Sequence, residues 1–319
     1  MDICHSILFM KKILILTVII TIFITCNKKD NVSAPAPVPV PVSFRILDSA
    51  QMITDLQALS SDAFKGRDAN RPEVVLTHQL IQARLRTAGT DSFAVGFAQN
   101  FNTGVARKNF LGLIHGRIYT DKYIVVGAHF DHFGVNSSGG IYHGADDNAS
   151  GTACVLAMAK YFKQHQPAYS IIFALWDGEE HGLLGSNYFV NHLPAGLDLS
   201  KIKFNLNMDM IARSDNNSTW ASGLSHYPAY SYLVDSIKNR TTVIQLKSGY
   251  DKPTDPQDWT YLSDHASFYN KSIPYLYLGV EDHPDYHQIT DTFDKIDKNK
   301  FTENANIAVQ MVLLLDRKL

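Results

Sequence analysis

Short apolar runs alternate with amphipathic stretches along most of the chain. The spacing of apolar residues predicts helices over residues 49–59, 73–87 and 151–164, and Ser150 is expected to cap the last of these. Four runs rich in β-branched and aromatic residues predict buried strands: Lys122–His129, Ser170–Trp176, Phe204–Met208 and Ile273–Leu278. Strands that alternate with helices indicate an α/β fold, with a largely parallel mixed sheet flanked by helices on both faces.

The first 25 residues have the pattern of an export signal. Lys11 and Lys12 precede an apolar run, Ile13–Thr25, which has the length of the apolar region of a secretory signal and is short for a membrane span. Cys26 follows directly, and Ile24-Thr25-Cys26 resembles the site at which bacterial lipoproteins are cleaved and lipidated. A cleaved secretory peptide and an uncleaved anchor are the alternatives. In all three cases we expect the rest of the chain to be exported, either periplasmic or at the cell surface, and a lipid on Cys26 would anchor it to the membrane.

Residues 26–42 are expected to form a tether, and residues 43–319 a single folded domain. Residues 34–42 read APAPVPVPV, and the alternating prolines exclude a helix and favour an extended chain. Beyond residue 43, neither a second proline-rich linker nor an internal repeat divides the sequence. The chain therefore consists of an export signal, a spacer and one domain.

The composition narrows the class of protein. The chain has 319 residues, of which 45% are hydrophobic and 19% charged, which is typical of a globular domain rather than a disordered or multi-pass membrane chain. With 29 Lys and Arg against 31 Asp and Glu, the near-neutral charge argues against nucleic acid as a partner. Three cysteines cannot form a disulfide framework, and Cys154 is expected to be buried as a small apolar residue.

Residues that can bind metal ions follow the predicted strands. In open α/β sheets, ligands bind beyond the carboxyl ends of the strands, so side chains placed there are expected to meet. An aspartate pair also precedes the predicted helix at residue 151, and a histidine follows the last predicted strand. The residues concerned are His129, Asp131, Asp146, Asp147, Glu179, Glu180, Asp209 and His287. Imidazole and carboxylate groups together suit zinc and similar ions.

Five motifs, taken together, resemble the M28 family of dinuclear zinc aminopeptidases. Their order and spacing match throughout, and the similarity extends from about residue 43 to the end of the chain, including the segment 59–67. The resemblance implies the zinc exopeptidase fold and a peptide substrate. The motifs are Gly127-Ala-His-Phe-Asp-His132, Gly144-Ala-Asp-Asp-Asn-Ala-Ser-Gly151, Trp176-Asp-Gly-Glu-Glu-His-Gly-Leu-Leu-Gly-Ser186, Asn207-Met-Asp-Met-Ile211 and Tyr286-His287.

The resemblance also implies a set of metal ligands. His129 and Asp209 would hold one Zn²⁺, Glu180 and His287 would hold the other, and Asp147 would bridge both. Other divalent ions remain open as substitutes for zinc. The remaining histidines of these segments, His132, His143, His181 and His283, are predicted not to bind metal.

The same resemblance implies three further roles. Glu179 would act as the general base toward a metal-bridging hydroxide, and Asp131 would accept the second N–H of the ligand imidazole of His129. Tyr286 would bind substrate by donating its hydroxyl to the oxyanion of the tetrahedral intermediate. Asp264, in a stretch that resembles the family's substrate pocket, would orient a substrate or a neighbouring ligand.

Two alternatives to an aminopeptidase remain open at the level of the sequence. A glutaminyl-cyclase-like enzyme shares the fold but uses a single zinc ion, and it would release a cyclised product instead of a free amino acid. A non-catalytic binding module on the same fold would be free to lose the base or a ligand. Glu179 and all five ligands are present, which favours hydrolysis. Neither the preferred N-terminal residue nor the oligomeric state follows from the sequence.

Overall fold

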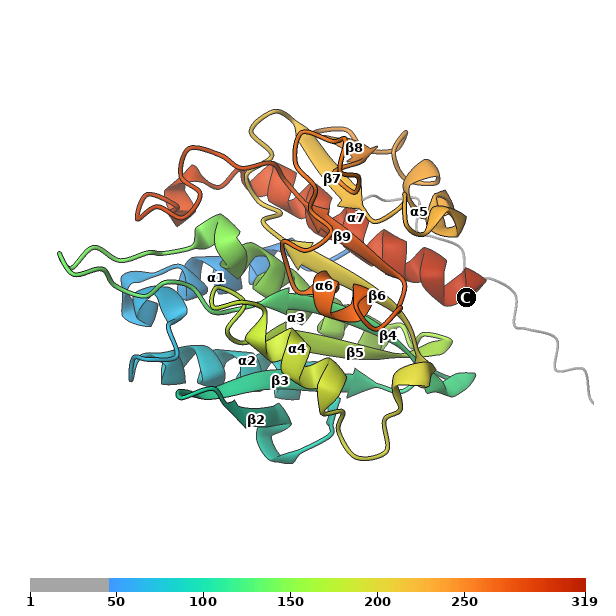
Figure 1. Cartoon of the computed structure of the whole chain (residues 1–319), viewed down its shortest axis with the longest axis horizontal. Helices are drawn as coiled ribbons and strands as arrows, with labels where there is room; N and C mark the ends of the chain where they lie inside the picture. The colour runs from blue at the N-terminus through green and yellow to red at the C-terminus, as the bar shows by residue number, and fades with distance from the viewer. Residues whose placement is uncertain (1–45) are drawn as a thin grey trace, which may run out of the picture. The chain divides into compact units, whose positions relative to one another are not determined.

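One mixed sheet of nine strands forms the centre of the computed structural model, which describes residues 46–319 (Figure 1). The strands are β1 (Asp91–Ser92), β2 (Ala98–Asn102), β3 (Ala106–Ile114), β4 (Tyr119–His129), β5 (Tyr169–Trp176), β6 (Ile202–Asp209), β7 (Ser218–Ser222), β8 (Gln245–Ser248) and β9 (Tyr275–Gly279). They lie side by side in the order β1-β3-β5-β4-β6-β9-β7-β8, and β2 pairs with β3.

The four central strands are parallel. Strand β4 pairs in parallel with β5 and β6, and β6 pairs in parallel with β9. Antiparallel pairs, β3 with β5 and β7 with β9, extend the sheet on both sides. All eight residues of β5 are buried, because helices cover both faces of a central parallel strand. The predicted largely parallel mixed sheet is confirmed.

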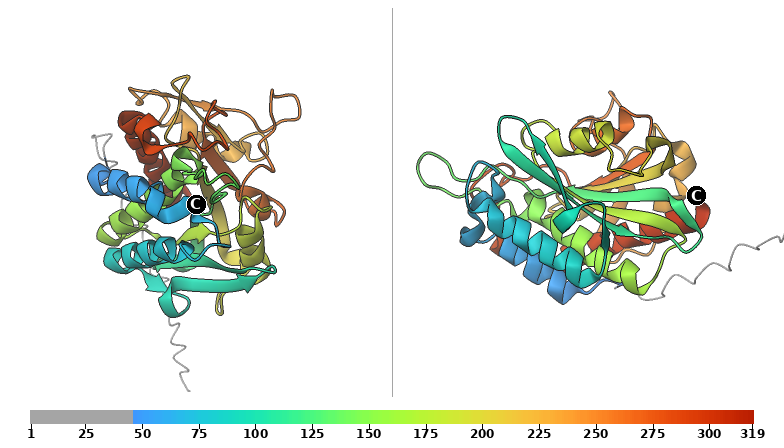
Figure 2. Two further views of the ribbon diagram at one scale, coloured as in Figure 1. Left: turned by 90° about the vertical axis from the view of Figure 1, so that its left-hand side faces the viewer. Right: turned by 90° about the horizontal axis from the view of Figure 1, so that it is seen from below.

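Seven α-helices of the described residues pack on the sheet. They are α1 (Ser49–Leu59), α2 (Val74–Ala88), α3 (Gly151–Gln164), α4 (Leu184–Asn191), α5 (Tyr232–Asp235), α6 (His265–Tyr269) and α7 (Lys298–Lys318). Helices α1, α2, α3 and α7 share one apolar core with the sheet, whereas α4 and α6 contribute to a second core. The two groups of helices lie on opposite sides of the sheet (Figure 2), which confirms the prediction that both faces are covered.

The larger core is built from aliphatic and aromatic side chains at helical spacing. Leu56 of α1, Leu85 of α2 and Phe162 of α3 are all completely buried in it. Burying each such side chain contributes about 1.5–3 kcal/mol. Cys154 of α3 is also buried there as a free thiol, as predicted, and burial raises its pKa above the ordinary value for a thiol.

The predicted elements agree with the structure in most places. Helices α1 and α3 have the predicted bounds, and α2 begins and ends one residue later than predicted. Each of the four predicted strands overlaps one central strand. The expected cap by Ser150 is wrong. Its hydroxyl donates to the carbonyl oxygen of Asp146, while Oδ1 of Asn148 accepts the hydrogen bond from the Gly151 N–H.

The expected signal peptide (residues 1–25), Cys26 and the tether (residues 26–42) lie outside the described residues and stay predictions. Between residues 46 and 319, every helix is too short or too polar to cross a membrane.

The carboxyl ends of the parallel strands lie at one edge of the sheet. Strand β4 ends at His129 and β6 ends at Asp209, and these strands are neighbours. Strand β5 ends three residues before Glu179, and β9 ends before the loop that contains His287. The topology therefore brings residues that are far apart in sequence to one place.

Candidate metal centre

His129 and Asp209 lie next to each other at the ends of β4 and β6. The Nε2 atom of His129 is 3.2 Å from Oδ1 of Asp209, and both residues are buried. The other carboxylate oxygen of Asp209 accepts a hydrogen bond from the hydroxyl of Ser263 at 2.8 Å. This bond fixes the carboxylate and leaves Oδ1 directed toward the imidazole.

Asp147 lies between two histidines. It belongs to the irregular turn Ala145–Ser150, which connects to the start of α3. Its Oδ1 atom is 3.3 Å from Nε2 of His129, and its Oδ2 atom is 3.3 Å from Nε2 of His287. One carboxylate therefore presents one oxygen to each side of the site.

Glu180 completes the side of the site that contains His287. Its Oε2 atom is 3.6 Å from Nε2 of His287, and its Oε1 atom is 2.5 Å from Nδ1 of His132. His132 is buried, and the prediction from sequence did not include it in the site. Its place directly after Asp131 and three residues after His129 was the available signal.

The turn that contains Asp147 is held by buried side chains from distant segments. The carboxylate of Asp291 accepts hydrogen bonds from the backbone N–H groups of Asp146 and Asp147 at 3.0–3.1 Å. Arg67, which is fully buried, donates to the carbonyl oxygens of Gly144 and Asp147 from the other side. Both the N–H and the carbonyl oxygen of Asp147 are therefore held, and the main chain of the turn positions its side chain.

Glu179 and Asp131 lie beside His129. The Oε2 atom of Glu179 is 3.9 Å from Nε2 of His129, and the Glu179 N–H donates to Oδ1 of Asp131 at 3.0 Å. The Nδ1 atom of His129 lies 3.2 Å from the backbone oxygen of Asp131 and 3.7 Å from its Oδ1. The carbonyl oxygen and a carboxylate oxygen of Asp131 thus both lie near Nδ1 of His129, and the role of the carboxylate toward this imidazole stays a prediction.

The site concentrates negative charge in a buried place. Burial raises the pKa of Glu179 well above the usual value for a glutamic acid, and the charge of Asp209 adds to this effect. Burial also raises the pKa of Glu180, and the charge of Asp147 adds to it. Burial alone would lower the pKa of His129, but the charges of Asp209 and Glu179 raise it well above its usual range. Divalent cations would offset this charge and favour the ionised carboxylates.

The arrangement fits a zinc site. In a tetrahedral zinc site with ligand bonds of about 2.0–2.1 Å, neighbouring ligand atoms are about 3.3 Å apart. The contacts of His129 with Asp147 and Asp209, and of His287 with Asp147, have this length. Two groups of three residues, His129-Glu179-Asp209 and His129-Asp147-Glu180, could each hold a metal ion. Within each group, the candidate ligand atoms lie within 4.8 Å of one another. The structure therefore brings all five predicted ligands together, while their roles as ligands stay predictions.

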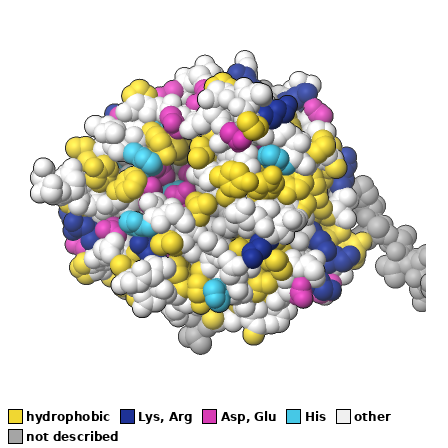
Figure 3. Space-filling view, viewed as in Figure 1, with side chains coloured by type: hydrophobic (Ala, Val, Ile, Leu, Met, Phe, Trp, Pro, Cys, Tyr) yellow, Lys and Arg dark blue, Asp and Glu magenta, His cyan; other side chains and the backbone are white. Residues whose placement is uncertain are grey.

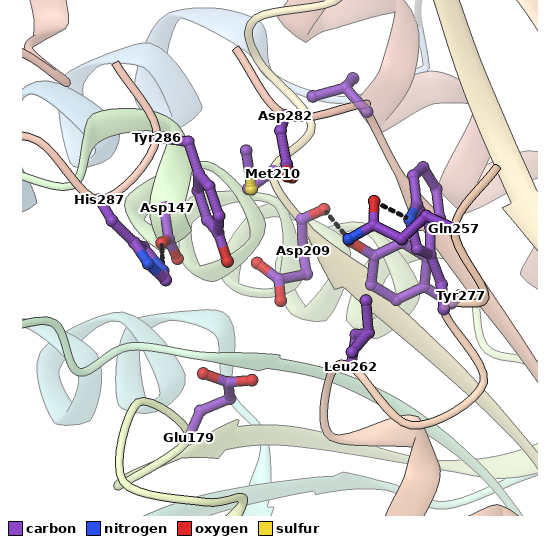
Figure 4. Close-up of a pocket in the computed structure, with 12 residues that line it drawn as sticks. Asp147, Glu179, Asp209, Met210, Gln257, Leu262, Tyr277, Asp282, Tyr286 and His287 are labelled. Atoms are coloured by element: carbon purple, nitrogen blue, oxygen red, sulfur yellow. Dashed lines mark hydrogen bonds and ion pairs between the residues drawn. The ribbon is translucent and has the colours of Figure 1, made fainter. Parts of the chain in front are cut away.

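A pocket opens beside these residues (Figure 4). Asp147, Tyr286 and His287 lie on one side of it and Glu179 on the opposite side, with Asp209 between them. The pocket is also lined by Met210, Gln257, Trp259, Leu262, Tyr277, Val280 and Asp282. In the space-filling view, acidic side chains gather in a hollow that histidine and apolar side chains surround (Figure 3).

Two further predicted residues are also found near the centre. Tyr286 lines the pocket, and its ring packs on that of His287 with 3.7 Å between centroids. Burial, with the charges of Asp147 and Asp209, raises the pKa of Tyr286, so its hydroxyl keeps its proton. Asp264 is completely buried and does not line the pocket, and its role in orienting a substrate or a neighbouring ligand stays a prediction.

The sequence matches one family over most of the domain. Residues 109–312 match peptidase family M28. Leucine aminopeptidase 1 of Arthroderma otae is 28% identical over 284 residues, which cover 83% of this chain and 74% of that protein. Leupeptin-inactivating enzyme 1 of Streptomyces exfoliatus is 34% identical over 166 residues, which cover 50% of this chain and 34% of that enzyme.

Solved structures share the fold. The LapA aminopeptidase of Legionella pneumophila has a TM-score of 0.68 and 21% sequence identity, over 86% of this chain and 74% of that chain. A glutaminyl cyclase of Bacteroides thetaiotaomicron has a TM-score of 0.63 and 18% identity, over 84% of this chain and 98% of that chain. The family match covers well over half of the chain and confirms the resemblance drawn from the five motifs: the chain belongs to peptidase family M28.

Proposed function

We propose that this protein is an aminopeptidase that binds two zinc ions and removes the N-terminal residue of peptides. The observation that supports this most strongly is the place of Asp147, whose two oxygens face two different histidines at equal distance. His129 and Asp209 would hold one ion and His287 and Glu180 the other. Membership of the peptidase family and the names of the curated relatives support the same activity.

Zinc in this site would act as a Lewis acid toward the scissile carbonyl and would lower the pKa of water. The chain supplies the other parts of the reaction. Glu179 faces the ligands across the pocket, where its carboxylate can take the proton of the attacking water and pass it to the leaving amine. As the water oxygen bonds to the carbonyl carbon and the C–N bond breaks, the Tyr286 hydroxyl can donate to the oxyanion.

The glutaminyl-cyclase alternative has less support. The cyclase of Bacteroides thetaiotaomicron shares the fold at 18% identity, which says nothing about the reaction. A single-zinc enzyme has no need of a second pair of ligands, yet His129 and Asp209 are buried and in contact here. The geometry therefore favours hydrolysis with two ions over cyclisation with one.

The product separates these possibilities. We expect the purified protein to release free leucine from leucine 4-nitroanilide and free glutamine from a peptide that begins with glutamine, both detected by mass spectrometry. Removal of metal with a chelator should abolish release, and added zinc should restore it. A pyroglutamyl product without free glutamine would contradict the proposal and favour the cyclase. Bound zinc without turnover of either substrate would favour the binding module.

A further inference from the structure

The pocket has two parts with different chemistry. One part contains Asp147, Glu179, Asp209 and His287 of the metal centre. On the side of Asp209 away from Asp147 and His287, the pocket contains Gln257, Leu262 and Tyr277 (Figure 4). Three more apolar or aromatic residues, Met210, Trp259 and Val280, also line the pocket. If the scissile carbonyl lies at the metal centre, the adjoining part receives the side chain of the substrate's N-terminal residue. This step rests on the proposed function.

Asp282 is the charged residue that lines the pocket outside the metal centre. It is exposed at the rim of the pocket, near Met210 and Tyr286 (Figure 4). Within residues 46–319, its carboxylate forms neither an ion pair nor a side-chain hydrogen bond. Among the described residues that line the pocket there is neither a lysine nor an arginine. The carboxylate of Asp282 therefore places a negative charge at the rim, and no basic side chain within residues 46–319 pairs with it.

The neighbours of Asp282 add to the negative charge. Glu281 accepts hydrogen bonds from the Tyr250 hydroxyl and the Asn216 amide, so its oxygens are occupied. Burial, the hydrogen bond to Glu281, and the charges of Glu281, Asp255 and Asp282 together raise the pKa of Tyr250 to about 12. The charges of Glu281, Asp255 and Asp282 thus all act on the Tyr250 hydroxyl. Of these three carboxylates, Asp282 is the one that lines the pocket, and within residues 46–319 it has neither an ion-pair nor a side-chain hydrogen-bond partner.

We propose that Asp282 makes the enzyme prefer N-terminal lysine and arginine over uncharged residues of the same length. The apolar walls would contact the methylene stem of such a side chain, and the carboxylate at the rim would pair with the cationic end. Lysine and norleucine isolate this effect, because they share four side-chain carbons and differ in the terminal ammonium group. The exposed position of Asp282 limits the preference to a few-fold.

The test compares kcat/KM for the lysine, arginine and norleucine 4-nitroanilides. In the native enzyme we expect the lysine substrate to exceed the norleucine substrate about threefold to fivefold. In Asp282→Asn the lysine substrate should lose more kcat/KM than the norleucine substrate, so the ratio should fall to about one, and high salt should reduce the ratio in the native enzyme. Asp235→Asn is the control, since Asp235 is an exposed aspartate of α5 that does not line the pocket. It should keep the native ratio.

The possible outcomes are distinct. A lysine-to-norleucine ratio that is the same in the native enzyme and in Asp282→Asn would overturn the role of Asp282 while leaving the aminopeptidase intact. An equal loss for all three substrates in Asp282→Asn would also overturn it, because Asp282 would then act on the α-ammonium group or on the pocket as a whole. Failure of the native enzyme to cleave any of the three would instead overturn the proposed function.

Discussion

Replacing Glu179 with glutamine is expected to lower kcat by about 10²- to 10⁴-fold and to leave the zinc content unchanged. The amide has nearly the same shape as the carboxylate but cannot accept a proton from water. Glu179 lies 3.9 Å from His129 and lines the pocket, so it can reach an attacking water without serving as a ligand. Turnover of leucine 4-nitroanilide and zinc measured by mass spectrometry check both parts of the expectation.

Glu180→Gln is the matched comparison, because the two glutamates are adjacent and the chemical change is identical. Glu180 is in contact with His287 and His132, on the side of the site where the second ion would bind. This variant should lose zinc as well as activity. If Glu179→Gln kept native turnover, or if both variants lost zinc equally, the assignment of Glu179 as the base would be wrong.

The second large effect concerns stability and involves Arg67. Its guanidinium is fully buried and donates hydrogen bonds to five carbonyl oxygens. The acceptors belong to Leu59, Phe130, His143, Gly144 and Asp147. Arg67→Met would leave these oxygens without their donor, and we expect the free energy of unfolding to fall by about 4 kcal/mol or more. Thermal denaturation of the metal-free protein should show a Tm lower by about 10 °C.

Arg71→Met serves as the control for Arg67. Arg71 donates one such bond, to the carbonyl oxygen of Val135 at 3.1 Å, and lies partly exposed. We expect this variant to lose only about 1 kcal/mol. Similar shifts in Tm for the two variants would show that the five bonds of Arg67 are not what stabilises this region.

The central strands and three helices, α1, α2 and α3, could be predicted because their burial repeats regularly. Strand β5 is buried throughout and mostly apolar, and α3 has an apolar stripe at helical spacing. Helix α7 was missed because polar residues interrupt its buried face. Asn304 and Asn306 are fully buried there, and their amides donate to the carbonyl oxygens of Ile211 and Thr302. Such burial depends on partners that the sequence pattern does not show.

The site could be predicted to a similar extent. The five ligands follow strands or begin a helix, so topology and the family motifs point to them together. The role of Arg67 could not be inferred, because its acceptors lie up to 80 residues away in sequence. The contact of His132 with Glu180 spans 48 residues and likewise arises only in the folded chain. The cap at α3 was misassigned because Asn148 and Ser150 are both suitable, and only the backbone of the turn decides between them.

In the proposed function, five side chains hold a pair of zinc ions with Asp147 between them. Diffraction data collected at the zinc absorption edge, on crystals of the protein purified with zinc, test it directly. We expect two anomalous peaks about 3.5–4 Å apart, one beside His129 and Asp209 and the other beside Glu180 and His287. A single peak, or peaks away from Asp147, would contradict the claim.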